Sequence, residues 1–380
     1  MKIFAALFLL GVLPAPPVQP TPPAQLDWPL WTRYQDHFVQ KDGRVVDYDR
    51  DNLTTSEGES YAMFFALVAN DPAGFELLYR WTASNLANGD LQKNLPAWSW
   101  GRRPDGTLDV KDSNSASDAD LWIAYDLLQA GRLWKRHEYT VVGDALLEQI
   151  ASREVSRNHA FPVLLPAHDG FEHDDVIVTN ASYMPLFLLE AAAQAQPQGP
   201  WRAMVVSLPA LIQKTTVQGF AIDWFKVESD GTISPTPALD SVELHASGSY
   251  DAIRVYLWAG LTHPSTPGRD AMLKNLYGMV SYMTSHSVPP EFASEGQPTV
   301  RGIGPVSFSA ALIPFLEAVH EFNAAHLQEN RLTSAWVART GLYRDPPRYY
   351  DQNLAMFALG YTEHRYRIQS NGDLEVSWRR

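Results

Sequence analysis

Residues 112–124 read Asp112-Ser113-Asn114-Ser115-Ala116-Ser117-Asp118-Ala119-Asp120-Leu121-Trp122-Ile123-Ala124. A polar run passes directly into an apolar one here. This order is typical of the start of a buried helix, because Ser, Asn and Asp side chains cap the free N–H groups of a first turn and the helix dipole favours aspartate there. The stretch therefore predicts a helix that begins near Asp118 and carries acidic side chains at its N-terminal end.

Outward from this stretch, apolar residues recur at helical spacing in about twelve segments of roughly 12–20 residues, separated by loops rich in Gly, Pro, Asp and Ser. The predicted helices begin near Trp28, Glu57, Pro72, Asp118, Trp134, Ser182, Trp201, Tyr250, Arg269, Ser307, Glu329 and Asp351. Strand signals are few, at residues 176–178, around residues 220–233 and in a terminal hairpin about Asn371-Gly372. The chain is therefore predicted to be dominated by α-helix.

Every second helix start falls at a similar interval, near residues 57, 118, 182 and 250. A helical hairpin cannot bury its apolar face alone, so units of this kind stack or close on themselves. Six pairs predict a closed ring of inner and outer helices, an (α/α)6 barrel with a few short strands in its loops. The alternative is an irregular helical domain whose intervals agree by chance, since no sequence identity between the units supports a repeat.

A second acidic helix start lies in residues 54–63. Ser56 with Glu59 three residues on fits a capping box, and Thr54 with Glu57 offers the same geometry one register earlier. If Ser56 is the cap, Glu59 serves the helix start and Glu57 is free to project. In the predicted ring this helix is an inner one, as is the helix near Asp118.

A third acidic helix start lies in residues 248–256, where Asp251 and Arg254 stand three apart. This spacing equally permits a simple surface ion pair. In the predicted ring, however, Glu57, Asp118 and Asp251 all open inner helices, so the three carboxylates would share one mouth.

The loop of residues 95–101 adds Trp98 and Trp100 close to the acidic run. Flat indole faces beside carboxylates suit a sugar-binding groove, because a pyranose presents an apolar face of C–H bonds and a rim of hydroxyl groups. A saccharide is therefore the substrate class that these residue types favour.

At these residues the sequence resembles glycoside hydrolase family 8. The resemblance rests on four separated segments: residues 116–124, Ser56-Glu57-Gly58, Ser249-Tyr250-Asp251-Ala252-Ile253-Arg254 and Tyr349-Tyr350-Asp351-Gln352-Asn353-Leu354. Two positions depart from the family pattern, since Asp126 stands where a small residue is usual and Glu59 where Gln is expected. The resemblance implies an (α/α)6 barrel and inverting, endo-acting hydrolysis of a β-1,4-glucan chain such as cellulose.

The resemblance also implies roles for particular residues. The proton donor falls on Glu57, the general base on Asp251, and the carboxylate that grips the sugar at the scissile subsite on Asp118. Tyr250 and Arg254 flank the base and are expected to orient it, and the aromatic subsites fall on Trp98, Trp100, Tyr183 and Tyr349. An inverting enzyme needs room for a water, so the carboxyl groups of the acid and the base are expected about 6.5–9.5 Å apart.

Other activities remain open from the sequence. Relatives of this family cut xylan, chitosan or mixed-linkage glucan, and a polysaccharide lyase can use a similar helical ring. A non-catalytic polysaccharide-binding protein would also use such a groove, with the carboxylates only accepting hydrogen bonds from hydroxyl groups. The resemblance favours cellulose and implies a functional association with a cellulose synthase complex.

The composition excludes several classes of binding partner and cofactor. The 380 residues carry a formal net charge of -13, and no stretch concentrates Lys and Arg, so nucleic acid is not an expected partner. The chain has no Cys, which excludes disulfides and thiolate ligands. His173-Asp174-Asp175 lies on an extended segment whose side chains alternate faces, so neither a metal nor a cofactor is expected.

The N-terminus predicts export. Lys2 precedes the apolar run of residues 3–13, which is too short to span a bilayer, and residues 14–23 are rich in Pro. Residues 1–25 are therefore predicted to be a signal peptide with a Pro-rich lead-in, although an uncleaved membrane anchor is the alternative. Residues 26–380 are predicted to form a single catalytic domain, periplasmic or secreted and monomeric.

Overall fold

The computed structural model describes residues 27–237, 245–297 and 299–379, so the predicted signal peptide and lead-in lie outside the described residues. Within these ranges the chain forms thirteen α-helices and eighteen short strands. The helices are α1 (Pro29–Phe38), α2 (Ser56–Val68), α3 (Pro72–Leu86), α4 (Ser117–Trp134), α5 (His137–Arg153), α6 (Leu186–Ala195), α7 (Trp201–Lys214), α8 (Ala252–Leu261), α9 (Arg269–Asn275), α10 (Tyr277–Met283), α11 (Val306–Ala318), α12 (Phe322–Ser334) and α13 (Tyr349–Thr362).

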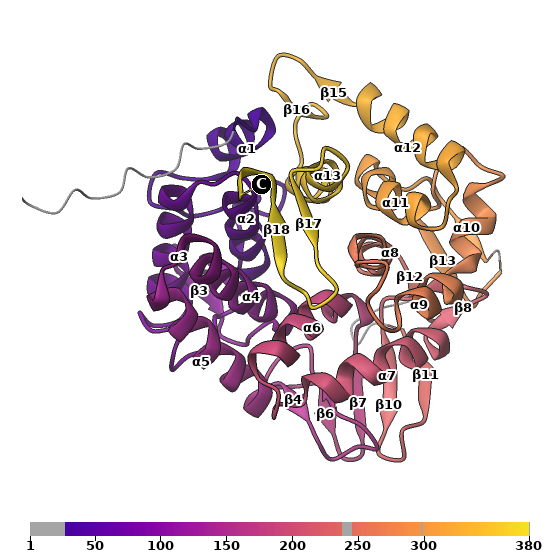
Figure 1. The fold of residues 1–380 in the computed structure, drawn as a ribbon, viewed down its shortest axis with the longest axis horizontal. Coiled ribbons are helices and arrows are strands. Elements are labelled where there is room, and N and C mark those ends of the chain that lie inside the picture. Colours follow the sequence, from indigo (N-terminus) through magenta and orange to yellow (C-terminus); the bar gives the residue numbers. More distant parts are fainter. Residues whose placement is uncertain (1–26, 238–244, 298, 380) are drawn as a thin grey trace, which may run out of the picture.

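Six helices form an inner ring (Figure 1). In order these are α2, α4, α6, α8, α11 and α13, each contacting the next, and α13 returns to α2. Around them, α3, α5, α7, α9 and α12 each pack on the inner helix that precedes them, and α1 packs on α13. The predicted (α/α)6 barrel is confirmed.

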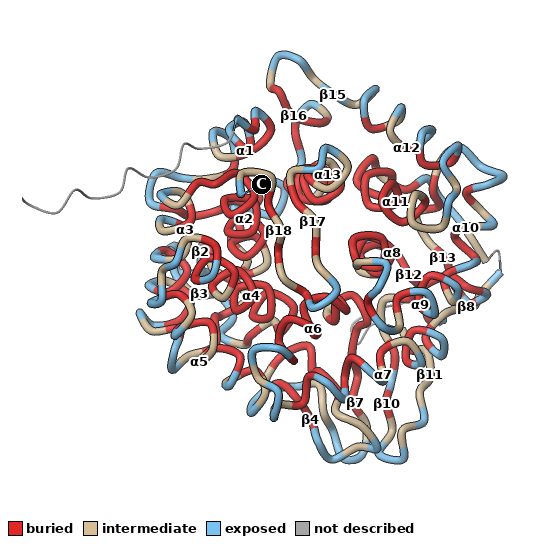
Figure 2. The backbone as a smooth tube through the Cα atoms, viewed as in Figure 1, coloured by how far each residue is buried: buried red, intermediate tan, exposed pale blue. Residues whose placement is uncertain are grey.

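The inner helices are buried on nearly every side, as Figure 2 shows. All ten residues of α8 are buried, and all of them except Arg254 are apolar or aromatic. The centre of the ring is filled by aromatic side chains from several inner helices. The Phe357 ring centroid, for example, lies 4.9 Å from that of Tyr61 and 5.2 Å from those of Trp122 and Trp258. The ring is therefore a packed core and has no open channel through it.

Three helix starts differ from the prediction. Trp134 is the last residue of α4, and α5 begins at His137. The turn at Ser182 is a short 3-10 helix, η1 (Ala181–Tyr183), and α6 begins only at Leu186, because Pro185 disfavours helical backbone in the residue before it. The helix expected near Glu329 begins at Phe322. Its start was missed because its buried face holds mainly small and polar residues, Ala324, Ala325, Gln328 and Leu332.

The strands lie in the connections between helices. They are β1 (Thr54–Thr55), β2 (Ser99–Arg102), β3 (Leu108–Asp112), β4 (Val155–Ser156), β5 (Val163–Leu164), β6 (Glu172–His173), β7 (Val176–Thr179), β8 (Thr216–Val217), β9 (Phe220–Ala221), β10 (Phe225–Glu228), β11 (Ile233–Pro235), β12 (Ser247–Gly248), β13 (Phe292–Ser294), β14 (Val300–Arg301), β15 (Trp336–Val337), β16 (Leu342–Tyr343), β17 (Tyr366–Ile368) and β18 (Leu374–Val376). The three predicted strand regions are confirmed. The larger sheets have the antiparallel orders β1-β2-β3, β11-β10-β7-β6 and β12-β13-β14.

The C-terminal hairpin β17–β18 crosses one end of the ring (Figure 1). Its turn carbonyl at Gly372 accepts a hydrogen bond of 3.0 Å from the Tyr125 hydroxyl of α4, and the Trp378 indole donates to the Leu67 carbonyl at the end of α2. These contacts join the hairpin and the residues just after it to the middle of α4 and the C-terminal end of α2. The N-terminal ends of α2 and α4 therefore lie away from it. No helix in the described ranges is long and apolar enough to cross a bilayer.

Asp126 of α4 is fully buried where the family resemblance predicts a small residue, and its carboxyl oxygens have no hydrogen-bond partner among the described residues. Burial raises its pKa well above the usual value. The folded state therefore binds the proton more tightly than the unfolded state does, and the free energy of unfolding falls as the pH rises above the unfolded pKa of about 4, by about 1.4 kcal/mol per unit until the folded pKa is reached.

We accordingly expect Asp126→Ala to gain stability relative to the wild type when the pH is raised from 5 to 8. Urea unfolding at both pH values measures this difference. The exposed Asp36→Ala is the control, because its carboxylate pairs only with the equally exposed Arg33. An unchanged stability difference between pH 5 and 8 would contradict the expectation.

Candidate active site

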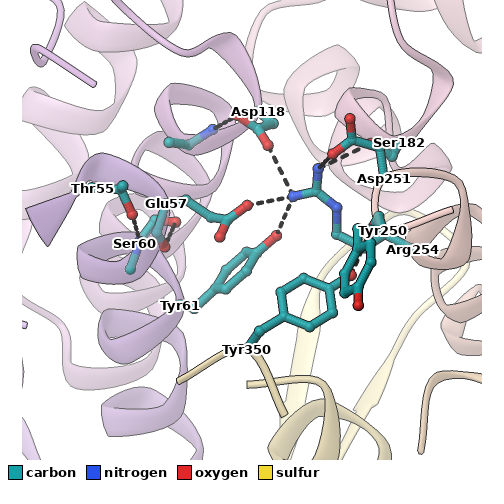
Figure 3. A network of polar contacts seen from close by, with 12 residues as sticks. Thr55, Glu57, Ser60, Tyr61, Asp118, Ser182, Tyr250, Asp251, Arg254 and Tyr350 are labelled. Atoms are coloured by element: carbon teal, nitrogen blue, oxygen red, sulfur yellow. Dashed lines mark hydrogen bonds and ion pairs between the residues drawn. The ribbon is translucent and has the colours of Figure 1, made fainter. Parts of the chain in front are cut away.

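The N-terminal ends of α2, α4 and α8 bring three carboxylates to one guanidinium group (Figure 3). Arg254 Nη1 binds Glu57 Oε2 and lies 3.3 Å from Asp118 Oδ2, while Nη2 lies 2.7 Å from Asp251 Oδ1. The Arg254 side chain is 4% exposed, against 25% for Glu57 and 32% for Asp251. The cation thus lies beneath two accessible carboxylates. The shared mouth predicted from the three helix starts is confirmed, and the Asp251–Arg254 pair is no simple surface ion pair.

The start of α2 differs from the predicted capping box. Thr55 is the N-cap, and its hydroxyl accepts from the Gly58 N–H at 3.1 Å, whereas Ser56 is the first helical residue. Glu59 is fully buried and accepts from the Val45 N–H at 2.7 Å. Glu59 therefore fastens a neighbouring segment to the helix. Glu57, the second residue of the helix, is left to face the groove.

Gly58 allows an aromatic side chain to approach this turn closely. A Cβ atom at Gly58 would stand 2.6 Å from the Tyr349 hydroxyl oxygen, which is closer than side chains tolerate. Any larger residue would displace the phenol, which is buried beside Glu57. The order Ser56-Glu57-Gly58 thus places an accessible carboxylate next to a glycine against which the Tyr349 phenol packs.

Two hollows meet at the carboxylates and form one groove. One has a volume of about 350 Å³ and the other about 180 Å³. Both are lined by the same five residues, Arg50, Thr55, Glu57, Asp251 and Arg254. The groove therefore continues to both sides of Glu57 and Asp251, whereas Asp118 lines only the smaller hollow. A larger hollow of about 770 Å³ lies on the outer wall near Asp144 and Gln196, but it has no aromatic residue in its lining.

The predicted aromatic residues divide into two groups. Trp98 and Tyr183 line the smaller hollow, and Tyr250 and Tyr349 line the larger part of the groove. Trp100 lines neither. Its ring instead packs against Trp81 at 5.4 Å and lies beneath the Arg44 guanidinium. Two residues that stand two apart share a face of a regular strand, but Trp98 precedes β2 and the pairing of β2 with β3 shifts register between Ser99 and Trp100.

Tyr250 was expected to orient the base, but its ring packs on Phe308 and Tyr350 at centroid distances of 5.2 and 5.5 Å. Asp251 is oriented by Arg254 instead. Tyr250 is 44% exposed and lines the larger part of the groove.

The carboxylate cluster retains a proton near neutral pH. Burial raises the pKa of Asp118 to about 7, an effect that Arg254 opposes and the nearby Glu57 carboxylate increases. The titration belongs to the interacting group as a whole and not to one carboxyl alone. Below about pH 7 Asp118 therefore holds a proton beside Glu57 and Arg254.

A second pair of carboxyl groups lies behind Asp118. Burial raises the pKa of Glu154 to about 8, and burial together with Glu154 raises that of Asp120 well above its usual value. The Ser115 hydroxyl donates to Glu154 Oε1. The fully buried pair therefore keeps a proton between its two carboxyl groups. Asp120 stabilises the start of α4 and does not line the groove.

Sequence reasoning missed several residues of the site. The Tyr61 hydroxyl and the Ser182 hydroxyl each lie 3.2 Å from a nitrogen of Arg254. Tyr61 follows Glu57 by four residues on α2, which is a spacing that places both on one helix face. Asp223 accepts two backbone N–H groups at the start of α8, and nothing in its sequence surroundings marks it.

A closed ring of paired helices with facing carboxylates in a groove at one end is the arrangement of a glycoside hydrolase. Residues 21–364 match glycosyl hydrolases family 8, and the chain belongs to this family. The family resemblance stated from four short segments is thereby confirmed.

The chain is similar to several endoglucanases over most of its length. It is 40% identical over 358 residues to an endoglucanase of Xanthomonas axonopodis pv. citri (strain 306), covering 93% of this chain and 90% of the relative. It is 37% identical over 357 residues to an endoglucanase of Escherichia coli (strain K12), covering 93% and 92%. The crystal structure of the endo-1,4-D-glucanase from Vibrio fischeri ES114 superposes with a TM-score of 0.85 at 34% identity, covering 93% of this chain and 100% of that one.

Proposed function

We propose that this protein is an inverting endo-β-1,4-glucanase that cuts cellulose-type glucan within the chain. The observation that carries the proposal is the groove that continues to both sides of Glu57 and Asp251. A polymer lying in it would place sugar units on both sides of the carboxylates, so cleavage would fall at an internal bond. The endoglucanase names of relatives that share nearly the full length support the same activity.

The proposed roles are those that the resemblance to the family implies, and the position of the carboxylates in the groove supports them. Glu57 protonates the oxygen of the leaving sugar, and Asp251 accepts a proton from the water that attacks the opposite face of the ring. Asp118, which lines only one side of the groove, accepts hydrogen bonds from the sugar at that side. Arg254, which lies beneath the groove, binds all three carboxylates and fixes their positions relative to one another. Trp98 and Tyr183, which line the smaller hollow, offer aromatic faces on which neighbouring sugars can stack.

Carboxymethylcellulose is the substrate for the test. Endo-cleavage predicts a rapid fall in viscosity while few reducing ends have formed, and proton NMR of the first product should show the α-anomer before mutarotation. Early β-anomer would contradict the inverting mechanism. A protein that lowered neither viscosity nor polymer length would be a binding protein. Parallel assays on xylan, chitosan and mixed-linkage glucan separate the substrates cut by relatives.

The activity should fall as the pH rises above about 7. Because the pKa of Asp118 is raised to about 7, Asp118 is protonated below that pH, and above it the site gains a second negative charge beside Glu57. We expect log(kcat/KM) to decrease with a slope near -1 on this limb, and Asp118→Asn, which cannot ionise, to displace the limb. Circular dichroism at each pH provides the control for unfolding. A rate that stays level to pH 9 would contradict this assignment.

The proposal extends to the setting in which the enzyme works. We infer from residues 1–25 an exported protein, periplasmic or secreted, in which residues 26–380 form one catalytic domain. A functional association with a cellulose synthase complex, with the enzyme acting as a monomer, fits a glucanase that meets newly exported chains. Fractionation of cells and sedimentation of the purified protein test location and oligomeric state.

A further inference from the structure

The helix that carries the proposed base lacks a cap of its own. Asp251 occupies the N-cap position of α8, where an aspartate side chain ordinarily accepts a backbone N–H of the first turn. Its side chain makes no such bond, and one of its oxygens lies instead 2.7 Å from Arg254 Nη2. The free N–H groups at this helix start therefore need an acceptor from elsewhere.

Asp223 supplies that acceptor from the segment between β9 and β10. Its Oδ1 accepts from the Ser249 N–H at 2.9 Å and from the Ala252 N–H at 2.7 Å, one on each side of Asp251. Its own N–H donates to the Ser247 carbonyl at 2.9 Å. A single carboxyl group thus holds the backbone on both sides of the proposed base.

The two segments are built to lie this close. A Cβ atom at Gly248 would stand 2.0 Å from the Ala221 carbonyl oxygen, so only glycine fits there. The Tyr256 hydroxyl of α8 accepts from the Ala221 N–H at 2.8 Å, one helical turn beyond Ala252. Asp223 is therefore held against the helix by two contacts of Ala221, two residues before it.

The charges around Asp223 agree with this placement. Burial and the nearby Asp251 carboxylate raise the pKa of Asp223 to about 7, while the two backbone N–H groups and Arg254 oppose the shift. A carboxyl oxygen accepts a hydrogen bond whether or not the group is ionised, so the cap persists through this range.

We propose that Asp223 is a positioning residue for the general base, capping α8 from a neighbouring segment so that the Asp251 carboxylate remains in the groove. The inference rests on the proposed function of Asp251. Without Asp223, the Asp251 carboxylate at the N-cap position can itself accept the free N–H groups of α8. Turning toward the helix would remove it from the attacking water.

The test compares Asp223→Ala with Asp223→Asn on carboxymethylcellulose. Because a displacement of about 1 Å in a catalytic group can cost 10²-fold, we expect kcat of Asp223→Ala to fall by about that factor, with KM within about twofold of the wild type. Asp223→Asn keeps the accepting oxygen and should restore kcat to within about threefold of the wild type. Asp230→Ala is the matched control, since Asp230 also accepts a loop N–H, that of Thr232, but far along the β10–β11 turn.

The outcomes distinguish the positioning role of Asp223 from the proposed glucanase activity on which it rests. If the wild type releases no reducing ends, the proposed function fails. If the wild type is active and a folded Asp223→Ala keeps its kcat, or if Asp223→Asn is as slow as Asp223→Ala, the positioning role is overturned. Should Asp223→Ala not fold, Tyr256→Phe loosens the same segment more gently. It should then lower kcat several-fold at unchanged KM, and an unchanged kcat would overturn the role.

Discussion

Glu57→Gln is expected to lower kcat on carboxymethylcellulose by about 10²–10⁴-fold, the contribution of a positioned general acid. Glutamine has nearly the same shape and can still bind Arg254 through its carbonyl oxygen, but it cannot give a proton to the leaving oxygen. KM should change little, because the groove keeps its lining. Initial rates of reducing-end release, measured across substrate concentrations, separate the two parameters.

Two glutamates provide matched controls for this variant. Glu138 is also the second residue of a helix, α5, but lies exposed on the outer wall, so Glu138→Gln should keep full activity. Burial raises the pKa of Glu59 well above its usual value, so Glu59→Gln replaces a neutral carboxyl by a neutral amide and should also remain active. Equal activity of Glu57→Gln and the wild type would remove the acid assignment, and with it the hydrolase mechanism argued from Glu57.

Arg254→Met should lower the free energy of unfolding by about 3–5 kcal/mol, because removing one partner of a buried ion pair leaves uncompensated charge behind. Here the substitution leaves Glu57, Asp118 and Asp251 close together without the cation that offsets their mutual repulsion. The penalty should shrink at lower pH, since protonation of Asp118 below about pH 7 removes one of the repelling charges. Activity should be lost together with the geometry.

Urea unfolding at pH 5 and pH 8 measures the stability of this variant. Arg80→Met is the control, because Arg80 forms an exposed ion pair with Glu76 on α3, and such pairs contribute at most about 1 kcal/mol. A loss for Arg254→Met no larger than for Arg80→Met, or one that increases toward pH 5, would show that the cation does not hold the cluster.

Local patterns were sufficient to predict much of the fold. The ring followed from the spacing of apolar segments, and the shared mouth followed because Glu57, Asp118 and Asp251 each stand at a helix start. Where local chemistry was ambiguous the prediction was less accurate. At the start of α2, three neighbouring residues, Thr54, Thr55 and Ser56, all have hydroxyl groups, and only the entry of the chain from β1 makes Thr55 the cap.

The rest of the site depends on contacts between residues far apart in the chain. The sequence predicts that Arg254 pairs with Asp251, three residues away, but gives no sign of its contact with Glu57, which lies 197 positions away. Asp223 caps a helix that begins 29 residues later, in a different loop. Trp98 and Trp100 have the spacing of two residues on one face of a strand, but the register shift between β2 and β3 interrupts the regular pattern and only Trp98 lines the groove. Such features depend on the closure of the ring and not on any local pattern.

The hairpin β17–β18 and the aromatic centre of the ring also determine how a polymer can arrive. A strand of glucan has no route through the middle of this molecule, so it must settle onto the open groove from the side. The enzyme then has no need to find a free end, and a long strand offers as many places of attack as it has accessible linkages. Initial velocity at a fixed mass of glucan should therefore be the same for long and for moderately shortened strands.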